Sequence, residues 1–312
     1  MNLRTALRRI LAMIPALIGA SIIAFALGVV APGDPAYMAL SQSATGEPRP
    51  EAVQELRAEW GLDDPVPVQY VKWVGRVLQG DLGVSYYTGS PVTEELMQRL
   101  PATLNLALVA TAMAVMVGIS TGVLSAVLAG GALDGALRVS TVFLASLPGF
   151  LVGLILILVF AEILGIMPTS GYGTWKHTVL PAVALATGPT AQLLRVTRTQ
   201  MIDVLGQDYM RTARAKGLAQ SVVVLQHGLR NTLINTLTVV GLYLAAILGG
   251  AAIIETVFAW PGIGRLAVDS ITRRDYPVVQ GFVLLAAGIY VLVNFVVDVL
   301  YSVIDPRVRA GE

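Results

Sequence analysis

The chain contains no cysteine, and its 312 residues include only two histidines. Without cysteine there is no disulfide bridge, no thiolate metal site and no cysteine nucleophile. Charge is also scarce, because Asp, Glu, Lys and Arg form 13% of the chain, where soluble domains carry roughly 25%. A net charge of +1 provides no basic face for phosphates, so we expect no nucleic-acid partner.

Signatures of ATP hydrolysis and of zinc chemistry are missing as well. None of the three lysines, Lys72, Lys176 and Lys216, belongs to a G-x-x-x-x-G-K-[ST] phosphate loop, and no H-E-x-x-H motif occurs. The two histidines, His177 and His227, lie on opposite sides of the membrane in the topology that we predict, so they cannot share a site. We therefore predict that the protein is not an enzyme and has no catalytic residue, no metal site and no cofactor.

Apolar residues, by contrast, form 55% of the chain and raise its mean hydropathy to +0.71. They are grouped in runs long enough to cross a bilayer, which takes about 20 residues. Six runs predict six transmembrane helices, at residues 10–31, 101–129, 136–163, 178–200, 232–254 and 281–304. The fourth gives the weakest signal, because Pro181 and Pro189 interrupt it. The predicted fold is therefore an all-α membrane protein.

The chain divides into three predicted parts. The first apolar run is longer than the core of a cleavable signal peptide, about 7–15 residues, and so predicts a retained helix. Residues 32–100 differ in kind, because they hold ten acidic and five basic residues and no long apolar run. We predict an N-terminal tail and first transmembrane helix at 1–31, a small extracytoplasmic insertion at 32–100, and a five-helix core at 101–312.

The placement of Lys and Arg near the ends of the runs predicts the orientation, because cytoplasmic loops are enriched in them. With both termini in the cytoplasm, the basic residues of the two tails and of the stretch 195–230 lie inside. Arg265, Arg273 and Arg274 count against this arrangement. We predict a multi-pass protein of the cytoplasmic (inner) membrane, with both termini inside, the insertion outside and a cytoplasmic loop between the fourth and fifth helices.

One polar stretch stands between the fourth and fifth runs. Residues 206–233 read GQDYMRTARAKGLAQSVVVLQHGLRNTL, which predicts a helix, a stop at Gly217 and a second helix. Asp208 is the candidate N-cap of the first helix, and Arg214 and Lys216 suit its C-terminal end because of the helix dipole. Basic residues that bind lipid headgroups would explain the charge alone. A helix that docks in a partner's cleft explains the fixed corner as well.

The stretch DYMRTARAKGLAQSVVVLQHGLRN resembles the cytoplasmic loop of ATP-binding-cassette (ABC) importer permeases of the dipeptide, oligopeptide and nickel transport family. Further matches follow in the family's order, among them PGDP at 32–35, GLDDPVPVQY at 61–70, RLPATLNLAL at 99–108 and ETVFAWPGIGRLAVDSITRRDYPVVQG at 255–281. The resemblance covers nearly the whole chain. One departure is RTARAKG, where the general loop pattern has an acidic residue before two alanines.

The resemblance implies one half of a membrane pore that moves when partner subunits hydrolyse ATP. The implied partners are a second homologous permease subunit in a heterodimer, two nucleotide-binding ATPase subunits, an extracytoplasmic solute-binding protein and membrane lipid. The loop 203–230 would couple the permease to the ATPase, with Leu218–Arg230 as the coupling helix. The residues implied for this contact are Asp208, Arg211, Ala213, Arg214, Ala215, Gly217, Leu218, Leu225, His227 and Arg230.

The implied function is the translocation of dipeptides or oligopeptides across the cytoplasmic membrane. Nickel or a metal chelate is the alternative substrate, since GYGTWKHTVLPA at 171–182 and FAWPGIGR at 258–265 resemble nickel permeases equally well. An ion-coupled secondary transporter is the alternative of a different class. It would place carboxylates near the bilayer midplane, whereas Glu162 and Asp298 lie near the ends of their runs. The sequence assigns no substrate-binding residue.

Two further interpretations stay open. The Trp-Pro-Gly turn at 260–262 predicts either an aromatic anchor at the membrane surface or an outer gate that contacts the delivering protein. A structural or receptor protein could use residues 32–100 as an ectodomain. That class leaves the ordered polar helices at 206–233 without an explanation.

Overall fold

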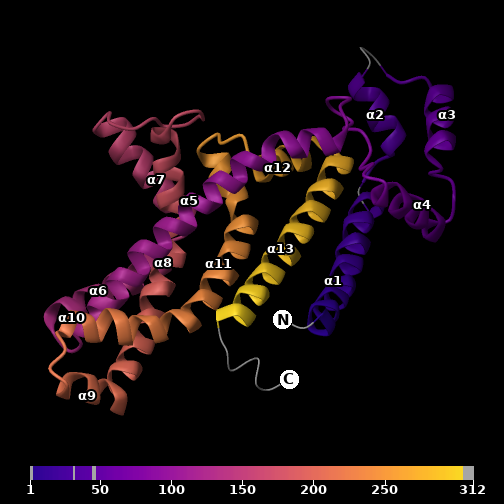
Figure 1. The fold of residues 1–312 in the computed structure, drawn as a ribbon. Helices are drawn as coiled ribbons and strands as arrows, with labels where there is room; N and C mark the ends of the chain where they lie inside the picture. Colours follow the sequence, from indigo (N-terminus) through magenta and orange to yellow (C-terminus); the bar gives the residue numbers. More distant parts are fainter. Residues whose placement is uncertain (1–2, 31, 44–46, 305–312) are drawn as a thin grey trace.

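Helices form most of the described backbone (Figure 1). The computed structural model of the chain describes residues 3–30, 32–43 and 47–304. Within these ranges the strand-like pairing is limited to one isolated bridge, between Val84 and Pro91. The predicted all-α fold is confirmed.

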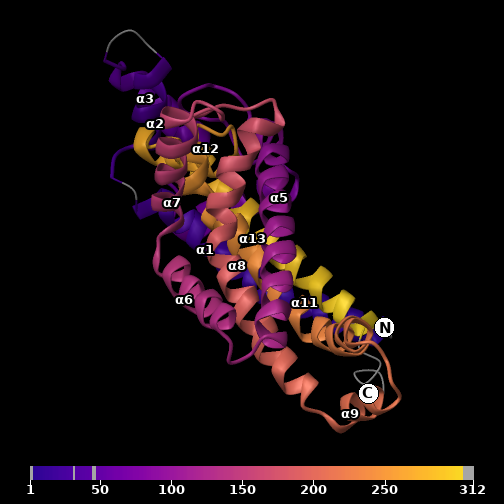
Figure 2. The same ribbon diagram turned by 90° about the vertical axis from the view of Figure 1, so that its left-hand side faces the viewer.

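Five long helices run between two ends of the molecule (Figures 1 and 2). Their bounds are α1 Leu3–Val30, α5 Val92–Val127, α8 Trp175–Leu205, α11 Arg230–Val257 and α13 Tyr276–Ile304. α5 and α8 pack along each other, and α13 packs against both α11 and α1. We call the end where α8 finishes the loop end, and the end where α5 begins the insertion end.

Four of the described helices are long and apolar enough to cross a membrane. They are the part of α1 at Leu11–Val30, α5, α8 and the part of α13 at Tyr276–Val297. A bent pair of helices makes a fifth candidate if it is one span. The count of six spans therefore stays a prediction, with α11 covering the fifth predicted run. α8 continues through Pro181 and Pro189, so the weakest predicted run forms one helix.

The third predicted run, residues 136–163, is not one straight helix. Its parts are α6 (Ala132–Ser146), α7 (Gly149–Leu156) and a π-helical turn, η1 (Ile157–Ile163). The two halves are bent by 101°. Pro148 causes the break, because proline removes a backbone donor and keeps the preceding Leu147 extended, at φ −87° and ψ 127°. The prediction of a single continuous helix was wrong here: the chain forms a broken span or a re-entrant loop.

The central helix pair packs closely because glycines of α5 face α8. A Cβ atom added at Gly118 would lie 2.7 Å from Cβ of Leu193, and one added at Gly122 would lie 2.7 Å from Cβ of Thr197. Small residues let two helix backbones approach each other, which is a common basis of helix association inside a membrane. The α5–α8 contact therefore depends on glycines that let the two helix backbones lie close together.

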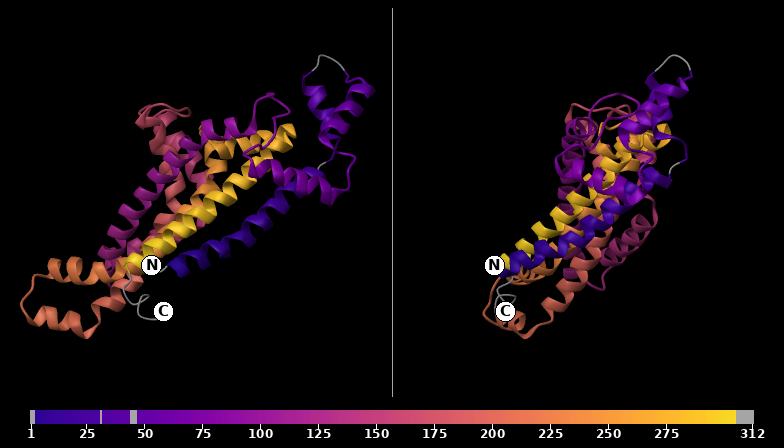
Figure 3. Two further views of the ribbon diagram at one scale, coloured as in Figure 1. Left: turned by 45° about the vertical axis from the view of Figure 1, so that its right-hand side comes forward. Right: turned by 90° about the vertical axis from the view of Figure 1, so that its right-hand side faces the viewer.

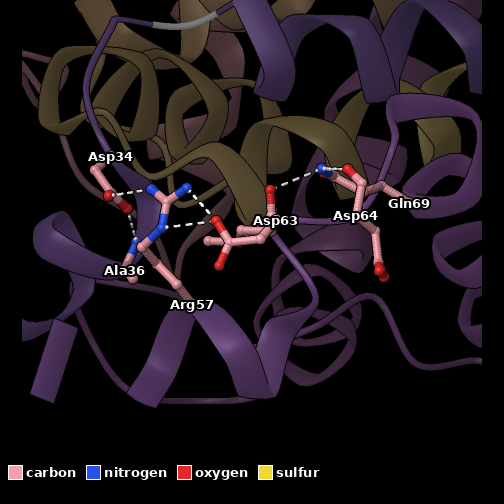
Figure 4. A network of polar contacts seen from close by, with 7 residues as sticks. Asp34, Ala36, Arg57, Asp63, Asp64 and Gln69 are labelled. Carbon is pink, nitrogen blue, oxygen red and sulfur yellow. Dashed lines mark hydrogen bonds and ion pairs between the residues drawn. The ribbon is translucent and has the colours of Figure 1, made fainter. Parts of the chain in front are cut away.

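Three short helices make up the insertion between α1 and α5. They are α2 (Pro35–Ser43), α3 (Pro50–Trp60) and α4 (Val66–Leu78). Figure 4 shows that Arg57 joins two parts of this segment, donating to Asp34 over 2.5 Å and to Asp63 over 2.6 Å. The Gln69 amide also donates to the Asp64 backbone carbonyl at 2.8 Å. Because hydrogen bonds to charged groups are the stronger kind, a polar segment can hold a defined shape with little core.

Aromatic side chains attach α4 to α1. The Phe25 ring meets the Tyr70 ring edge-on, with centres 5.4 Å apart, and lies 5.6 Å from the Trp73 ring. The hydroxyl groups of Ser21 and Tyr70 are 2.8 Å apart. Such aromatic pairs add specific geometry to the burial of apolar surface. α4 therefore packs on the first long helix through its aromatic residues.

The two ends of the molecule carry different segments. The start of α1 and the end of α13 lie at the loop end, together with α9 (Asp208–Ala215), whereas α2, α3 and α4 lie towards the opposite end (Figure 3). This placement agrees with a topology in which both termini share one side of the membrane. The outermost residues of the predicted tails, 1–2 and 305–312, lie outside the described residues.

Candidate functional site

The polar segment predicted to dock a partner projects from the loop end (Figure 3, left). α8 ends at Leu205, and α9 then forms the outermost helix at this end (Figure 1). A short helix, α10 (Gln220–Val222), a π-helical stretch, η2 (Val223–Leu229), and then α11 follow without interruption. We call α9, the corner at Gly217, α10 and η2 together the α9 hairpin.

The corner of the α9 hairpin is built on Gly217, where the sequence predicts a stop. Its φ of +75° lies in the left-handed region, which costs other L-residues about 1–2 kcal/mol. Its N–H donates to the Arg214 carbonyl at 3.0 Å. A Cβ atom added at Gly217 would meet nothing within 4 Å. The backbone conformation, and not crowding, is what favours glycine here.

The boundaries predicted for the second helix are wrong. Leu218 precedes this helix, which begins at Gln220 and continues through Arg230 into α11. The backbone stays right-handed at Arg230, with φ −55° and ψ −41°, so nothing stops the helix there. At the start of the hairpin, Asp208 is the first residue of α9, and Gln207 caps the helix without a side-chain bond. Residues 218–230 are thus not a separate helix but lead into a membrane-length one.

The inner face of α9 packs on the segment that follows it. Met210 and Val223 are fully buried, and Ala213, in the same apolar cluster, is 8% exposed. Val204 and Leu205 at the end of α8 pack against this cluster. Ala213 therefore has a packing role, because a larger side chain at this position would displace α9 from the bundle.

Polar contacts also tie the α9 hairpin to the neighbouring helices. The Arg214 guanidinium donates to the Leu205 carbonyl at 3.2 Å. The Asn231 amide donates to the Tyr209 hydroxyl at 3.2 Å and to the His227 carbonyl at 2.8 Å. α9 is therefore held both to the end of α8 and to the start of α11.

Most residues predicted to meet an ATPase subunit lie on the outer surface of the hairpin. Ala213 is buried and His227 is half-buried. The other eight are exposed: Asp208, Arg211, Arg214, Ala215, Gly217, Leu218, Leu225 and Arg230. Leu218 and Leu225 are 40% and 56% exposed, which places apolar surface among the charges. The ion pair of Asp208 with Arg211, 3.4 Å apart and almost fully exposed, contributes little stability.

A buried ion pair joins the first turn of α6 to α8. Asp134 is 1% exposed, and Arg198 donates to its two carboxylate oxygens at 2.7 and 2.8 Å. The Ser125 hydroxyl donates to the same carboxylate at 2.6 Å, and the Gly130 backbone N–H donates at 3.0 Å. A buried charge is tolerated when it is both paired and hydrogen-bonded in this way.

At the insertion end, a buried carboxylate holds the start of α12 (Ile263–Arg273). The Glu255 side chain is fully buried, and it accepts the Thr103 hydroxyl at 2.6 Å and the Arg265 backbone N–H at 2.9 Å. Thr103 in turn accepts the backbone N–H of Ile263 at 2.9 Å. A carboxylate suits this place because the free N–H groups at a helix N-terminus attract negative charge.

Trp260 lies beneath this turn and not at the surface. It is fully buried, and its indole N–H donates to the Ala102 carbonyl at 3.0 Å. The Tyr172 ring stands edge-on to it, with centres 4.8 Å apart. The interpretation of Trp260 as an aromatic anchor at the membrane surface is therefore wrong. Its ring supports α12 and the loop that carries Tyr172.

Asp275, between α12 and α13, joins the insertion to this end of the molecule. Its carboxylate is buried and accepts the Ser85 hydroxyl at 2.5 Å and the Tyr86 backbone N–H at 3.0 Å. Burial raises the pKa of the Tyr86 phenol above its usual range, and the charge of Asp275 raises it further. The Arg273 guanidinium lies 4.0 Å from the centre of the Tyr87 ring, a cation–π contact across the same junction.

Sequence reasoning missed these three carboxylate clusters. Asp134, Glu255 and Asp275 each stand beside an apolar run, where a charged residue is expected to reach water. Their partners are 64, 152 and 190 positions away in the chain. The resemblance of residues 255–281 to a family motif marked the region of Glu255 and Asp275, but it did not indicate these contacts.

An open cavity of about 480 Å³ lies towards the insertion end, between α5 and the start of α8. We call it the α5–α8 cavity. It is lined by Asn105, Val109, Met113, Tyr172, Gly173, Thr174, Trp175, Thr178 and Val179. None of these nine residues carries a formal charge.

Comparison with known protein families matches nearly the whole chain. Residues 118–310 match the binding-protein-dependent transport system inner membrane component family. Residues 2–107 match the N-terminal region described for such membrane components. The two matches leave only a short stretch of α5 between them.

Curated relatives match the chain end to end. The oligopeptide transport system permease protein AppB of Bacillus subtilis (strain 168) is 41% identical, over 97% of this chain and 98% of that protein. With the same coverage, the glutathione transport system permease protein GsiC of Pectobacterium atrosepticum and the probable peptide ABC transporter permease protein y4tP of Sinorhizobium fredii are each 42% identical.

A solved structure matches the fold. A chain of the inward-facing MetNI methionine ABC transporter superposes with a TM-score of 0.56 at 19% sequence identity. The superposition covers 67% of this chain and 96% of that chain. At this identity the match supports the fold alone.

Proposed function

This chain belongs to the binding-protein-dependent transport system inner membrane component family, and we propose that it is the permease subunit of an ATP-driven importer of dipeptides or oligopeptides. The observation that carries the substrate class is the end-to-end relationship to permeases named for oligopeptide, glutathione and peptide transport. As a member of this family the chain is a multi-pass inner-membrane protein and not itself an ATPase.

The contact with the ATPase subunits is assigned to the exposed side of the α9 hairpin. This side carries Asp208, Arg211, Arg214, Ala215, Leu218 and Leu225. Three properties support the assignment: the hairpin projects from the bundle, its corner is fixed by Gly217, and its inner face is packed. His227 lies in η2 and Arg230 is the first residue of α11, so these two residues would pass displacement from the hairpin on to α11. ATP drives transport only if these contacts differ between two states of the assembly.

The proposed orientation places the α9 hairpin and both termini in the cytoplasm, and α2, α3 and α4 outside. In this arrangement each of two ATPase subunits docks on the hairpin of one permease. A second homologous permease completes the pore, giving a heterodimer, and a solute-binding protein delivers substrate at the insertion end. Lipid surrounds the exposed apolar side of α1, where residues such as Ile18, Ile22 and Ile23 are at least half exposed.

Transport by the complete assembly tests this function. The permease pair, the ATPase subunits and the solute-binding protein are reconstituted in proteoliposomes, and uptake of the radiolabelled tripeptide Ala-Phe-Ala is measured. We expect uptake that requires both ATP on the ATPase side and the binding protein on the other. Uptake driven by a proton or sodium gradient without ATP would overturn the proposal. ATP-driven uptake of nickel, without uptake of the peptide, would support the alternative substrate instead.

A further inference from the structure

We propose that the α5–α8 cavity is a substrate contact site of the permease, which holds one apolar or aromatic side chain of a peptide and pairs with the adjoining peptide group. The proposal rests on the import function proposed above. It assigns substrate-contacting residues, which neither the sequence motifs nor the family relationship assigns. The α5–α8 cavity has a volume of about 480 Å³, which is within the range of ligand sites, about 300–1,000 Å³.

One wall of the cavity is a single face of α5. Asn105, Val109 and Met113 follow one another at intervals of four residues, so they lie on the same side of the helix. Asn105 is exposed although it lies within a predicted membrane span. A polar amide is costly to leave facing hydrocarbon. This face of α5 is therefore turned towards water or towards a polar ligand.

Asn105 also provides the chemistry that a peptide needs. Its side-chain amide has one acceptor oxygen and an NH₂ donor, the same pair of functions as a peptide bond. Within the described residues this amide has no hydrogen-bond partner. It can therefore accept a backbone N–H and donate to a backbone C=O of one extended residue, whatever the identity of that residue.

The opposite wall is aromatic and already ordered. Tyr172 and Trp175 are 53% and 67% exposed, which leaves their rings open to a ligand. Tyr172 is fixed from behind by the buried ring of Trp260, and the neighbouring Gly171 N–H donates to the Phe258 carbonyl at 3.0 Å. A preformed apolar wall with a few polar groups is typical of small-molecule sites. It suits an apolar or aromatic side chain.

The absence of charge from the lining decides which part of the peptide is held. The terminal ammonium and carboxylate groups of a peptide would find no partner of opposite charge among the nine lining residues. Desolvating such an unpaired charge is expensive. The cavity therefore binds an interior part of the substrate and tolerates peptides of different length. A lipid acyl chain could not form a hydrogen bond with the Asn105 amide or the Thr178 hydroxyl.

Thiol protection tests the site directly, because this chain has no cysteine of its own. Thr178→Cys places a single thiol in the cavity lining, and Ser170→Cys places one at an exposed position of the nearby loop, outside the lining. Each variant is assembled with its partner subunits in proteoliposomes and treated with a water-soluble methanethiosulfonate reagent. Peptide-loaded binding protein, carrying Ala-Phe-Ala, is added before the reagent in one set of samples and left out of the other. We expect it to slow labelling of the Thr178→Cys variant only, leaving the loop thiol of Ser170→Cys unaffected.

A second variant measures the contribution of the amide. Asn105→Leu should raise the half-saturating concentration of peptide-loaded binding protein about fivefold, the loss of about one hydrogen bond, and Asn105→Gln should restore part of it. An unchanged value in the leucine variant would overturn the role of Asn105. Equal labelling of Thr178→Cys with and without peptide would overturn the site. The site would also be overturned if the thiol of Thr178→Cys reacted in the isolated chain but not in the assembly. That result would mean that the second permease fills the cavity.

The unmodified assembly separates this proposal from the one on which it rests. If it takes up Ala-Phe-Ala with ATP while Thr178→Cys shows no protection, the cavity is rejected and the import function stands. If the unmodified assembly shows no ATP-dependent uptake, the import function itself is rejected, and the substrate site with it.

Discussion

Arg198 and Asp134 form a two-pronged ion pair, with nitrogen–oxygen distances of 2.7 and 2.8 Å, between α8 and the first turn of α6. Asp134 is almost completely buried, and the Arg198 side chain is 21% exposed. Because Ser125 of α5 donates to the same carboxylate, this cluster also joins the loop ends of α5 and α8, which already pack closely through Gly118 and Gly122. Its removal therefore loosens the part of the bundle from which the α9 hairpin projects.

Replacing Arg198 should strongly destabilise the protein. Arg198→Met leaves the Asp134 carboxylate buried without its counter-charge, and we expect the free energy of unfolding to fall by about 3 kcal/mol. The measurement is denaturant-induced unfolding of the purified chain in detergent. Arg211→Met is the matched control, because its ion pair with Asp208 is exposed and should contribute less than about 1 kcal/mol. Equal losses in the two variants would contradict the structural role of the buried pair.

Loss of the hydroxyl group should change the free energy of unfolding differently at two threonines of α5, Thr103 and Thr111. Thr103→Val leaves Glu255 without one donor and the Ile263 N–H without its acceptor, so unfolding free energy should fall by about 2 kcal/mol. Thr111 has a buried hydroxyl for which the described residues provide no partner. Thr111→Val should therefore be neutral or slightly stabilising. The same unfolding assay compares them, and a similar loss in both variants would reject the Glu255 cluster as an anchor for α12.

The corner of the α9 hairpin should depend on backbone conformation alone. Proline cannot adopt a positive φ, so Gly217→Pro should abolish uptake and its coupling to ATP hydrolysis while the chain still inserts in the membrane. Gly217→Asn should keep most of the activity, because asparagine tolerates the left-handed region. Uptake and ATPase activity of the reconstituted assembly provide the measurement. Normal uptake by the proline variant would count against a fixed corner.

Ala213 and Ala215 lie in one helix but should have different roles. Ala213→Leu overpacks the cluster of Met210 and Val223, and we expect a loss of about 1–3 kcal/mol in unfolding free energy. Ala215→Leu changes an exposed position and should leave stability unchanged. Because it enlarges the proposed docking surface, it should lower the ATPase activity that transport substrate stimulates. Loss of stability without loss of coupling in Ala215→Leu would reject this assignment.

The long helices and the polar segment were predictable because both depend on local signals. Hydropathy runs of sufficient length place α1, α5, α8 and α13, and Gly217 marks its own corner. The break at Pro148 was also a local signal, but the high hydropathy on both sides concealed it. Membrane helices tolerate proline in other places, as Pro181 and Pro189 of α8 show. The presence of a proline alone therefore does not predict a break in a helix.

The buried contacts were not predictable, because each joins residues far apart in the chain. Arg198 reads in sequence as a positive charge at the end of a span, and only the fold brings Asp134 to it. Trp260 likewise has the composition of a surface anchor, whereas its ring is buried beneath α12. The second helix of the α9 hairpin was misjudged for a different reason. Its bounds come from the family resemblance, but the helical backbone continues past Arg230 into α11.

The insertion is held at two points, one on α1 and one at the start of α13. Through Phe25 it is bound to α1, and through Ser85 and Tyr86 it is bound to Asp275 at the head of α13. Since α1 and α13 also pack on each other, the insertion, α1 and α13 are each in contact with the other two. None of the three can shift without disturbing both of its neighbours. A displacement of α2, α3 and α4 is therefore passed both to α1 and to the start of α13.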